Sequence, residues 1–421
     1  MPDHTPASAE AAPAGKTAVQ AHDEPLAFHP LTFQPEGDEV TVGRMDEGTF
    51  VVLPADGAAL LRRLVEGTPP RQAARWYEQE YGDPVDIDDF AAELTELGFL
   101  RADGIPEPLP ARPLRWRQLG RAVFSPVGAV LYTALLAACV LVVVRVPDAA
   151  PRYHNVFFTH YMSVLTLTLF VGQLPLILLH ESAHALAGRR LGVPSRLSIG
   201  RRLYYVVFET NLDGLAGVPR RSRYLPMLAG MLTDVGCFAV LTLLAAGTHR
   251  AGGGFPPAGA VLLALAYATL LRLVWQGYFF LQTDIYYLVV TVLGCVDLQT
   301  TARQLLANRW CALLRRPAPH DPEQWHPRDR SVARWYSWLM VAGYAFCLAT
   351  LLLTLLPILV HVFGTAVARL AGNGHQGGAG LADSLLFLVL SLGETAVAVT
   401  MYVRERRAAA PTAEAAAPAS A

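Results

Sequence analysis

The chain has 421 residues, of which 53% are hydrophobic and only 16% are charged, and its formal net charge at pH 7 is −1. This composition is too apolar for an ordinary soluble protein, and the near-zero net charge gives no reason to expect a nucleic-acid partner. The 5 Cys residues form no CxxC pair, which argues against a disulfide framework and a cysteine-based zinc site. Residues 1–26, which carry no signal-peptide pattern, and residues 404–421 are expected to be disordered tails.

Residues 27–105 are expected to form a small soluble α+β domain. β-branched and aromatic runs, separated by Gly and Asp, predict short strands at 31–33, 40–42 and 49–53. The spacing of apolar residues then predicts three helices, which end near Gly67, Gly82 and Gly98. This β-β-β-α-α-α order is that of a small winged-helix module. Residues 106–123 are expected to be a linker.

Residues 124–403 are expected to form a polytopic α-helical membrane domain with about six transmembrane helices. About 20 consecutive apolar residues suffice to cross a bilayer, and such stretches lie at 124–145, 161–187, 224–246, 335–362 and 380–403. A further apolar stretch, 258–296, is too long for one straight helix. We expect it to break around 282–284, because non-helical backbone at membrane depth occurs where it lines a cavity.

The placement of arginine orients this domain. Arg residues cluster before the first apolar stretch, after the second, before 335–362 and after the last, and such positive flanks stay in the cytoplasm. With six net crossings, both termini are expected in the cytoplasm. The Arg- and Ala-rich, Lys-poor composition looks like that of a GC-rich bacterial genome. The expected location is the bacterial cytoplasmic (inner) membrane.

The second apolar stretch contains the motif His180-Glu181-Ser182-Ala183-His184. Two His residues at i and i+4 of a helix face the same way and can share one metal ion, while the adjacent Glu can take a proton from water. A chance match is the alternative reading. Ionisable residues at membrane depth are rare and usually functional, so we interpret His180 and His184 as metal ligands and Glu181 as the catalytic residue of a protease in the bilayer.

Zinc in a catalytic site takes three protein ligands and keeps one open position. Asp284 and Asp213 compete for the third place. Asp213 precedes Gly214 in an Arg-rich loop, where an Asp-Gly step is a common turn. Asp284 lies in an apolar segment, where an unpaired carboxylate is costly, so Asp284 is the preferred ligand. Alternatively, Asp284 pairs with Arg272 or faces a water-filled cleft.

The membrane domain resembles the site-2 protease group of intramembrane zinc metalloproteases (the M50 class), and within it the bacterial putative peptide zinc metalloprotease branch. The matching segments are 179–185, 189–192, 203–208, 220–223, 228–230 and 283–287. The resemblance implies that His180, His184 and Asp284 hold zinc and that Glu181 is catalytic. The chain departs from the pattern at Ile285, where the branch has Gly, and at Met231, where the family has Pro; the usual Asn-Pro before Asp284 is also missing.

The N-terminal domain resembles PqqD-like domains, the leader-peptide recognition elements of ribosomally made peptide natural products. The matching segments are 50–53, 60–67 and 86–100. The resemblance implies that an extended leader adds to the sheet edge near 49–53, beside the helix at 86–97. The alternative is a generic winged helix used for packing or dimerisation.

The expected function is that of a membrane-embedded zinc endopeptidase, which cleaves a small ribosomally made precursor peptide captured through its leader. Its cofactor would be Zn²⁺, and its partners would be the precursor peptide with its leader and the lipid bilayer. Two alternatives remain open. One is regulated intramembrane proteolysis of a membrane-anchored signalling factor, and the other is a non-catalytic membrane scaffold or export partner.

Overall fold

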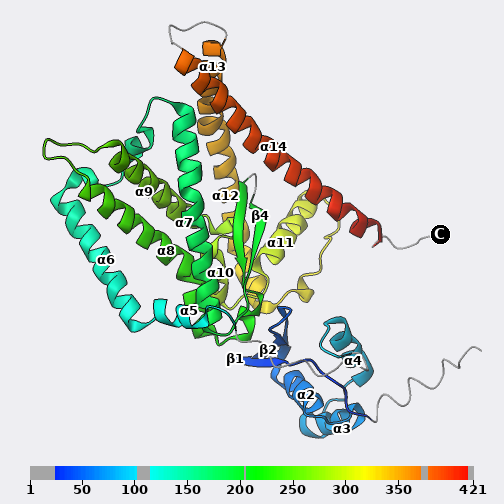
Figure 1. Ribbon diagram of the computed structural model, residues 1–421. Helices are drawn as coiled ribbons and strands as arrows, with labels where there is room; N and C mark the ends of the chain where they lie inside the picture. The colour runs from blue at the N-terminus through cyan, green and yellow to red at the C-terminus, as the bar shows by residue number, and fades with distance from the viewer. Residues whose placement is uncertain (1–23, 102–113, 203–204, 371–377, 416–421) are drawn as a thin grey trace, which may run out of the picture. The chain divides into compact units, whose positions relative to one another are not determined.

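The computed structural model describes residues 24–101, 114–202, 205–370 and 378–415, and these residues divide into two compact units (Figure 1). The first unit comprises the chain up to Arg115 together with Leu191–Pro194 and Leu212–Arg223. The second comprises Trp116–Arg190, Ser195–Asn211 and the chain from Tyr224 onward.

The first unit begins with an antiparallel sheet in the order β1-β2-β3. Its strands are β1 (Thr32–Glu36), β2 (Glu39–Arg44) and β3 (Thr49–Pro54). Gly37 adopts a φ of +70°, which lets the chain reverse between β1 and β2 within two residues. Three helices follow, namely α2 (Ala55–Val65), α3 (Pro70–Tyr81) and α4 (Ile87–Glu96). The predicted element order is therefore present, and after α4 a single antiparallel bridge joins Phe28 to Leu100.

The apolar faces of α2 and the sheet form the core of the first unit. Leu61, Leu64 and Phe99 are completely buried, and Val42 contributes from the central strand. Polar contacts fix the helix ends around this core. The carboxylate of Asp86 accepts the backbone N–H groups of the first turn of α4, both at 3.1 Å, which is the N-cap arrangement that stabilises a helix start.

A hydrogen bond joins α2 to α3: the Tyr77 hydroxyl donates to the Asp56 carboxylate. The bond favours the ionised form of Asp56 and lowers the pKa of that carboxyl. It also disfavours ionisation of the hydroxyl and raises the pKa of Tyr77 to about 12. The pair thus ties two helices together through a protonation-dependent contact.

A later part of the sequence completes the first unit. The 3-10 turn η3 (Asp213–Gly217) packs on the three-stranded sheet. A Cβ on Gly217 would approach Met45 Sδ and Thr32 Oγ1 to within 2.8 Å, so a larger residue there would displace these side chains. The guanidinium of Arg223 bonds the carboxylate of Glu36 in β1.

In the second unit, six helices are long and apolar enough to cross a membrane (Figure 1). The first four are α6 (Pro126–Arg145), α7 (Met162–Arg190), α8 (Arg220–Gly247, whose first residues belong to the first unit) and α9 (Pro257–Gln276). The fifth, Pro327–Ala368, runs through α12 (Pro327–Thr350), the π-helical turn η6 (Leu351–Leu355) and most of α13 (Leu356–Leu370). The sixth is the first part of α14 (Gly378–Ala415). Each overlaps an apolar stretch singled out in the sequence, which confirms the expectation of a polytopic helical protein.

The predicted break in 258–296 is present. α9 ends at Gln276, a 3-10 turn η4 (Phe279–Leu281) follows, and α10 (Asp284–Leu293) begins after Gln282, whose φ is +59°. The Thr283 hydroxyl donates to the Gln276 carbonyl at 2.7 Å and satisfies one end of the interrupted helix. After α10 the chain bends by 87° into α11 (Leu298–Leu313).

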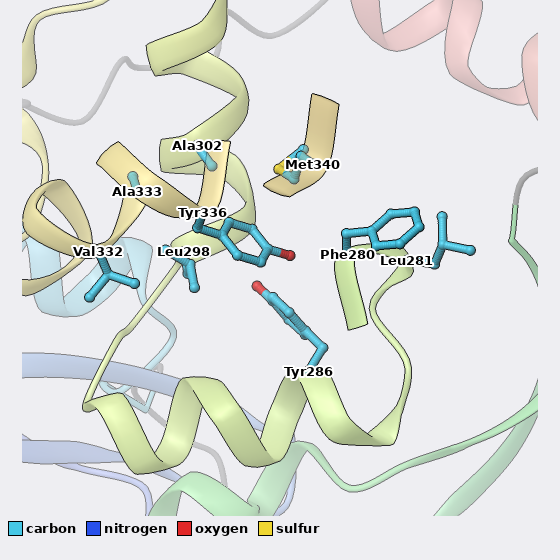
Figure 2. Close-up of a cluster of buried hydrophobic side chains, with 9 residues drawn as sticks. All are labelled: Phe280, Leu281, Tyr286, Leu298, Ala302, Val332, Ala333, Tyr336 and Met340. Atoms are coloured by element: carbon cyan, nitrogen blue, oxygen red, sulfur yellow. The ribbon is translucent and has the colours of Figure 1, made fainter. Parts of the chain in front are cut away.

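A buried cluster holds this broken region in place (Figure 2). It is formed by Phe280, Leu281, Tyr286, Leu298, Ala302, Val332, Ala333, Tyr336 and Met340. The hydroxyls of Tyr286 and Tyr336 point toward one another in Figure 2, and both bond Gln299. The Gln299 backbone N–H donates to Tyr286 at 3.1 Å, and the Tyr336 hydroxyl donates to the Gln299 side-chain oxygen at 2.7 Å. α10, α11 and α12 are thereby locked together.

An antiparallel hairpin packs beside α7 in the second unit. Its strands are β4 (Arg196–Arg202) and β5 (Tyr205–Asn211), which pair in the register Arg196 to Asn211. The Thr210 hydroxyl of β5 donates to the backbone carbonyl of Glu181 at 3.0 Å and so attaches the hairpin to the motif-bearing turn of α7.

Candidate metal centre

The C-terminal half of α7 carries the HExxH motif. α7 also packs against α5 (Arg117–Val123), α9 and α14 (Figure 1). His180, Glu181 and His184 are all buried. Because the two His residues are one helical turn apart, their rings lie on the same side of the helix, with centroids 4.9 Å apart.

Asp284 completes a group that could hold a metal ion. Its Oδ2 atom lies 3.1 Å from His180 Nε2 and 3.3 Å from His184 Nε2, and the two Nε2 atoms are 3.2 Å apart. Ligand atoms about 2.0–2.1 Å from a tetrahedral zinc ion are about 3.3 Å from one another. The three atoms thus have the spacing of three corners of a zinc coordination tetrahedron.

The other nitrogen of each ring identifies the tautomer. His184 Nδ1 lies 2.7 Å from the Pro226 carbonyl oxygen, and His180 Nδ1 lies 2.9 Å from Asp234 Oδ2. Because a carbonyl and a carboxylate only accept hydrogen bonds, both Nδ1 atoms carry a proton, and in the neutral form that binds a metal both Nε2 atoms present lone pairs. Three acceptor atoms therefore converge with no donor among them, an arrangement that a cation stabilises.

Asp284 is held at the start of α10 by a reciprocal pair of hydrogen bonds. The Gln276 side-chain amide donates to Asp284 Oδ2 at 3.0 Å, and the Asp284 backbone N–H donates to the Gln276 side-chain oxygen at 3.1 Å. The break between α9 and α10 thus positions the carboxylate. The alternative that Arg272 pairs with Asp284 is wrong, because Arg272 bonds Asp234 instead.

Asp213, the competing ligand, is the first residue of η3 and belongs to the first unit. The side chain of Asp213 lies outside the described part of the structure, whereas His180 and His184 come together with Asp284.

The formal charges around the site also favour a divalent cation. The carboxylates of Glu181, Asp234 and Asp284 and the guanidinium of Arg272 surround two imidazoles in the neutral tautomer. With both imidazoles neutral, as metal binding requires, these groups together carry two negative charges, which is costly among helices apolar enough to cross a membrane. A divalent cation would bring the total to zero.

Glu181 points toward the same place from the turn of α7. Its Oε1 atom lies 4.0 Å from His180 Nε2, too far for a hydrogen bond and close enough to reach a small molecule beside the three ligand atoms. Chemically, the arrangement offers a cation site with an adjacent carboxylate that is not itself a ligand.

Sequence reasoning missed Asp234 and the role of Arg272. Each is an ionisable residue inside an apolar helix, Asp234 in α8 and Arg272 in α9. That placement alone marks both as candidates for a buried pair, and it was the signal available in the sequence.

No family model, curated protein or solved structure matches this chain. The chain is therefore characterised by its own geometry, as a polytopic helical protein with a small N-terminal sheet and a buried His–His–Asp group that could hold a metal ion.

Proposed function

We propose that this protein is a membrane-embedded zinc endopeptidase that matures a small ribosomally made peptide. One observation carries the proposal. Three acceptor atoms, two from α7 and one from the start of α10, converge at tetrahedral spacing beside Glu181 of α7, a helix apolar enough to cross a membrane. A metal site with a neighbouring free carboxylate is the minimum that metal-assisted peptide hydrolysis needs.

Two imidazoles and one carboxylate form a ligand set that catalytic zinc uses, with one coordination position left open. His180, His184 and Asp284 would hold it. Bound there, zinc would lower the pKa of a nearby water molecule and polarise the carbonyl of the scissile bond.

Glu181 supplies the proton transfers. Its carboxylate takes a proton from the attacking water as the water oxygen bonds to the carbonyl carbon of the peptide. It then gives that proton to the nitrogen of the leaving amine as the C–N bond breaks. Burial of Glu181 and its fixed place on α7 keep the carboxylate within reach of both atoms.

The first unit supports capture of the substrate through a leader. Its three-stranded sheet and three helices follow the order of the PqqD-like winged-helix domains that the sequence resembles. Among the described strands, β3 lies at a sheet edge, and an extended peptide can add to such an edge by backbone hydrogen bonds. By the same resemblance, the helix α4 would provide side-chain contacts to the leader. The Arg-rich flanks of the apolar helices support a bacterial cytoplasmic membrane location with both termini in the cytoplasm.

The decisive experiment compares small peptides from the native host, with wild-type protein and with a chromosomal Glu181→Gln variant, by mass spectrometry. We expect a truncated peptide to disappear and its longer precursor to accumulate in the variant. Glu80→Gln, an exposed change in α3, is the matched control and should leave the peptide pattern unchanged. An unchanged pattern with Glu181→Gln, under conditions of expression, would move the weight to the non-catalytic scaffold.

Leader capture has its own test. Full-length Glu181→Gln protein should bind the precursor and should bind the leaderless core peptide much more weakly. Equal binding of the two would contradict leader recognition and favour cleavage of a membrane-anchored factor.

A further inference from the structure

Asp234 is a completely buried carboxylate in the middle of α8, and it contacts a residue of the candidate metal centre. We infer that Asp234, held in place by Arg272 and Gln173, is the positioning residue that aims His180 at the metal. This inference rests on the proposed metal site. It adds the residue that sets the affinity of that site for the metal.

Arg272 of α9 fixes the carboxylate of Asp234 in place. Arg272 grips the carboxylate with two parallel hydrogen bonds, from Nε to Oδ2 at 3.0 Å and from the terminal nitrogen to Oδ1 at 2.5 Å. Such a fork fixes the plane of the carboxylate as well as its position. It also compensates the charge of a group that would be very costly to bury alone.

Asp234 in turn orients the ring of His180. The same Oδ2 atom that accepts from Arg272 accepts the Nδ1 proton of His180 at 2.9 Å. Because the plane of the carboxylate is fixed, this bond fixes both the tautomer and the rotation of the ring. Nε2, on the far side of the ring, then points at Asp284 Oδ2 and His184 Nε2. Partners of this kind orient metal-binding imidazoles and raise their basicity.

Gln173 connects Arg272 to α7, the helix that carries His180. A terminal nitrogen of Arg272 donates to the side-chain oxygen of Gln173 at 2.7 Å, and the Gln173 amide donates to the Leu265 carbonyl of α9 at 3.1 Å. Gln173 precedes His180 by two helical turns and lies on the same face of α7. The contacts form a closed ring, from Gln173 through Arg272 and Asp234 to His180, that crosses α7, α9 and α8.

The two imidazoles of the site are supported unequally. His184 donates to a neutral backbone carbonyl, that of Pro226, whereas His180 donates to a charged carboxylate. A change at Asp234 therefore acts on one ligand and leaves the other in place, so the expected effect is weaker binding rather than its complete loss.

The test measures the zinc affinity of the purified full-length protein in detergent by competition with a chelator. Asp234→Asn should weaken zinc binding by about 10–100-fold, the usual effect of removing such a partner. Arg272→Lys keeps the positive charge but loses the fork, and we expect a smaller loss of affinity. The electronic spectrum of the Co²⁺-loaded protein, which reports ligand geometry independently of activity, should change in both variants.

Asp329→Asn is the matched control. Like Asp234, Asp329 is a buried carboxylate, but it lies in the first turn of α12. It accepts the backbone N–H groups of Val296 and Asp297 and touches none of the metal-site residues. This variant should lose stability and keep wild-type zinc affinity in its folded fraction.

The outcomes separate the inference from the function it builds on. If the wild type binds about one zinc ion and folded Asp234→Asn and Arg272→Lys bind it equally tightly with unchanged Co²⁺ spectra, the positioning role of Asp234 is overturned while the metal site stands. If Asp234→Asn fails to fold, Arg272→Lys decides by the same criteria. If the wild type binds no zinc, both proposals are overturned.

Discussion

Gly230 of α8 faces His184 of α7 so closely that a Cβ atom on Gly230 would overlap the Nε2 atom of His184. The same Cβ would also overlap Nε2 of His180. Glycine at this position therefore leaves the space in which the lone pairs of the two histidines meet, and a single methyl group would fill it.

Gly230→Ala is expected to abolish stoichiometric metal binding, because the new methyl group takes the place between the two imidazoles. Zinc content of the purified protein measures the effect. Gly236→Ala in the same helix is the control, since its Cβ would make only an ordinary contact, 3.4 Å from the Tyr132 ring. In a helix interior without such a contact, exchanging Gly for Ala stabilises the helix by about 1 kcal/mol. A folded Gly230→Ala protein with full zinc content would contradict the proposed position of the metal.

The choice between the two candidate third ligands can be tested directly. His180→Ala, His184→Ala and Asp284→Asn should each lose stoichiometric zinc, because each removes one of three converging ligand atoms. Asp213→Asn should keep it. The reverse result for the two aspartates would show that the ligand comes from the loop before α8 rather than from the break before α10.

The catalytic role proposed for Glu181 predicts a separation of binding from turnover. Glu181→Gln keeps the size and burial of the side chain but cannot accept a proton, so zinc content should stay at the wild-type level. Cleavage of the precursor should fall by about 10²–10⁴-fold, the usual contribution of a general acid–base group. Wild-type cleavage rates in this variant would exclude the mechanism.

The apolar pattern predicted the membrane helices well, because burial in lipid demands about 20 consecutive apolar residues and leaves a signal in every such stretch. The break before Asp284 was predictable for a related reason, since one straight helix cannot use all of 258–296. The HExxH spacing placed His180 and His184 on one face because helical geometry alone determines it.

Other features depend on contacts between distant segments, and no local pattern carries them. Asp234 lies 54 residues from His180 in the sequence, and only the packing of α8 on α7 brings the carboxylate to the ring. The segment Leu212–Arg223 joins the N-terminal sheet although more than a hundred residues separate the two in the sequence. The sequence likewise could not show that Arg272 pairs with Asp234 rather than with Asp284, the alternative considered for it.

The polar network inside the cluster of Figure 2 predicts a stability effect. Tyr336→Phe removes the donor to the Gln299 side-chain oxygen and leaves that buried acceptor unpaired. The cost should be about 1–3 kcal/mol, measured by thermal denaturation in detergent. Tyr344→Phe is the control, because the Tyr344 ring packs edge-on against Phe280 at 5.6 Å and its hydroxyl is not part of this network. Equal effects of the two changes would contradict the role given to Gln299.

The Tyr77–Asp56 pair makes the first unit sensitive to pH at two extremes. The Tyr77 hydroxyl, bonded to the carboxylate, has its pKa raised to about 12. The stabilisation is therefore complete below the ordinary tyrosine pKa of about 10 and is lost as the pH rises toward the raised value. For Asp56 the sign is opposite, because its pKa is lowered. That contribution is present above the ordinary pKa of an aspartate and is lost as the pH falls through the lowered one.

Absorbance of the tyrosinate ion isolates this pair. The titration of the wild type minus that of Tyr77→Phe should show one group with a pKa of about 12. Asp56→Asn removes the negative charge that opposes ionisation of the hydroxyl, so in that background the same group should titrate nearer to about 10. Tyr81, which stacks on Tyr77 with ring centroids 5.0 Å apart, supplies a matched Tyr81→Phe control that keeps the hydrogen bond. A wild-type difference curve centred at the ordinary tyrosine pKa would mean that the hydroxyl does not donate to Asp56 in solution, and the tie between α2 and α3 would then rest on apolar packing alone.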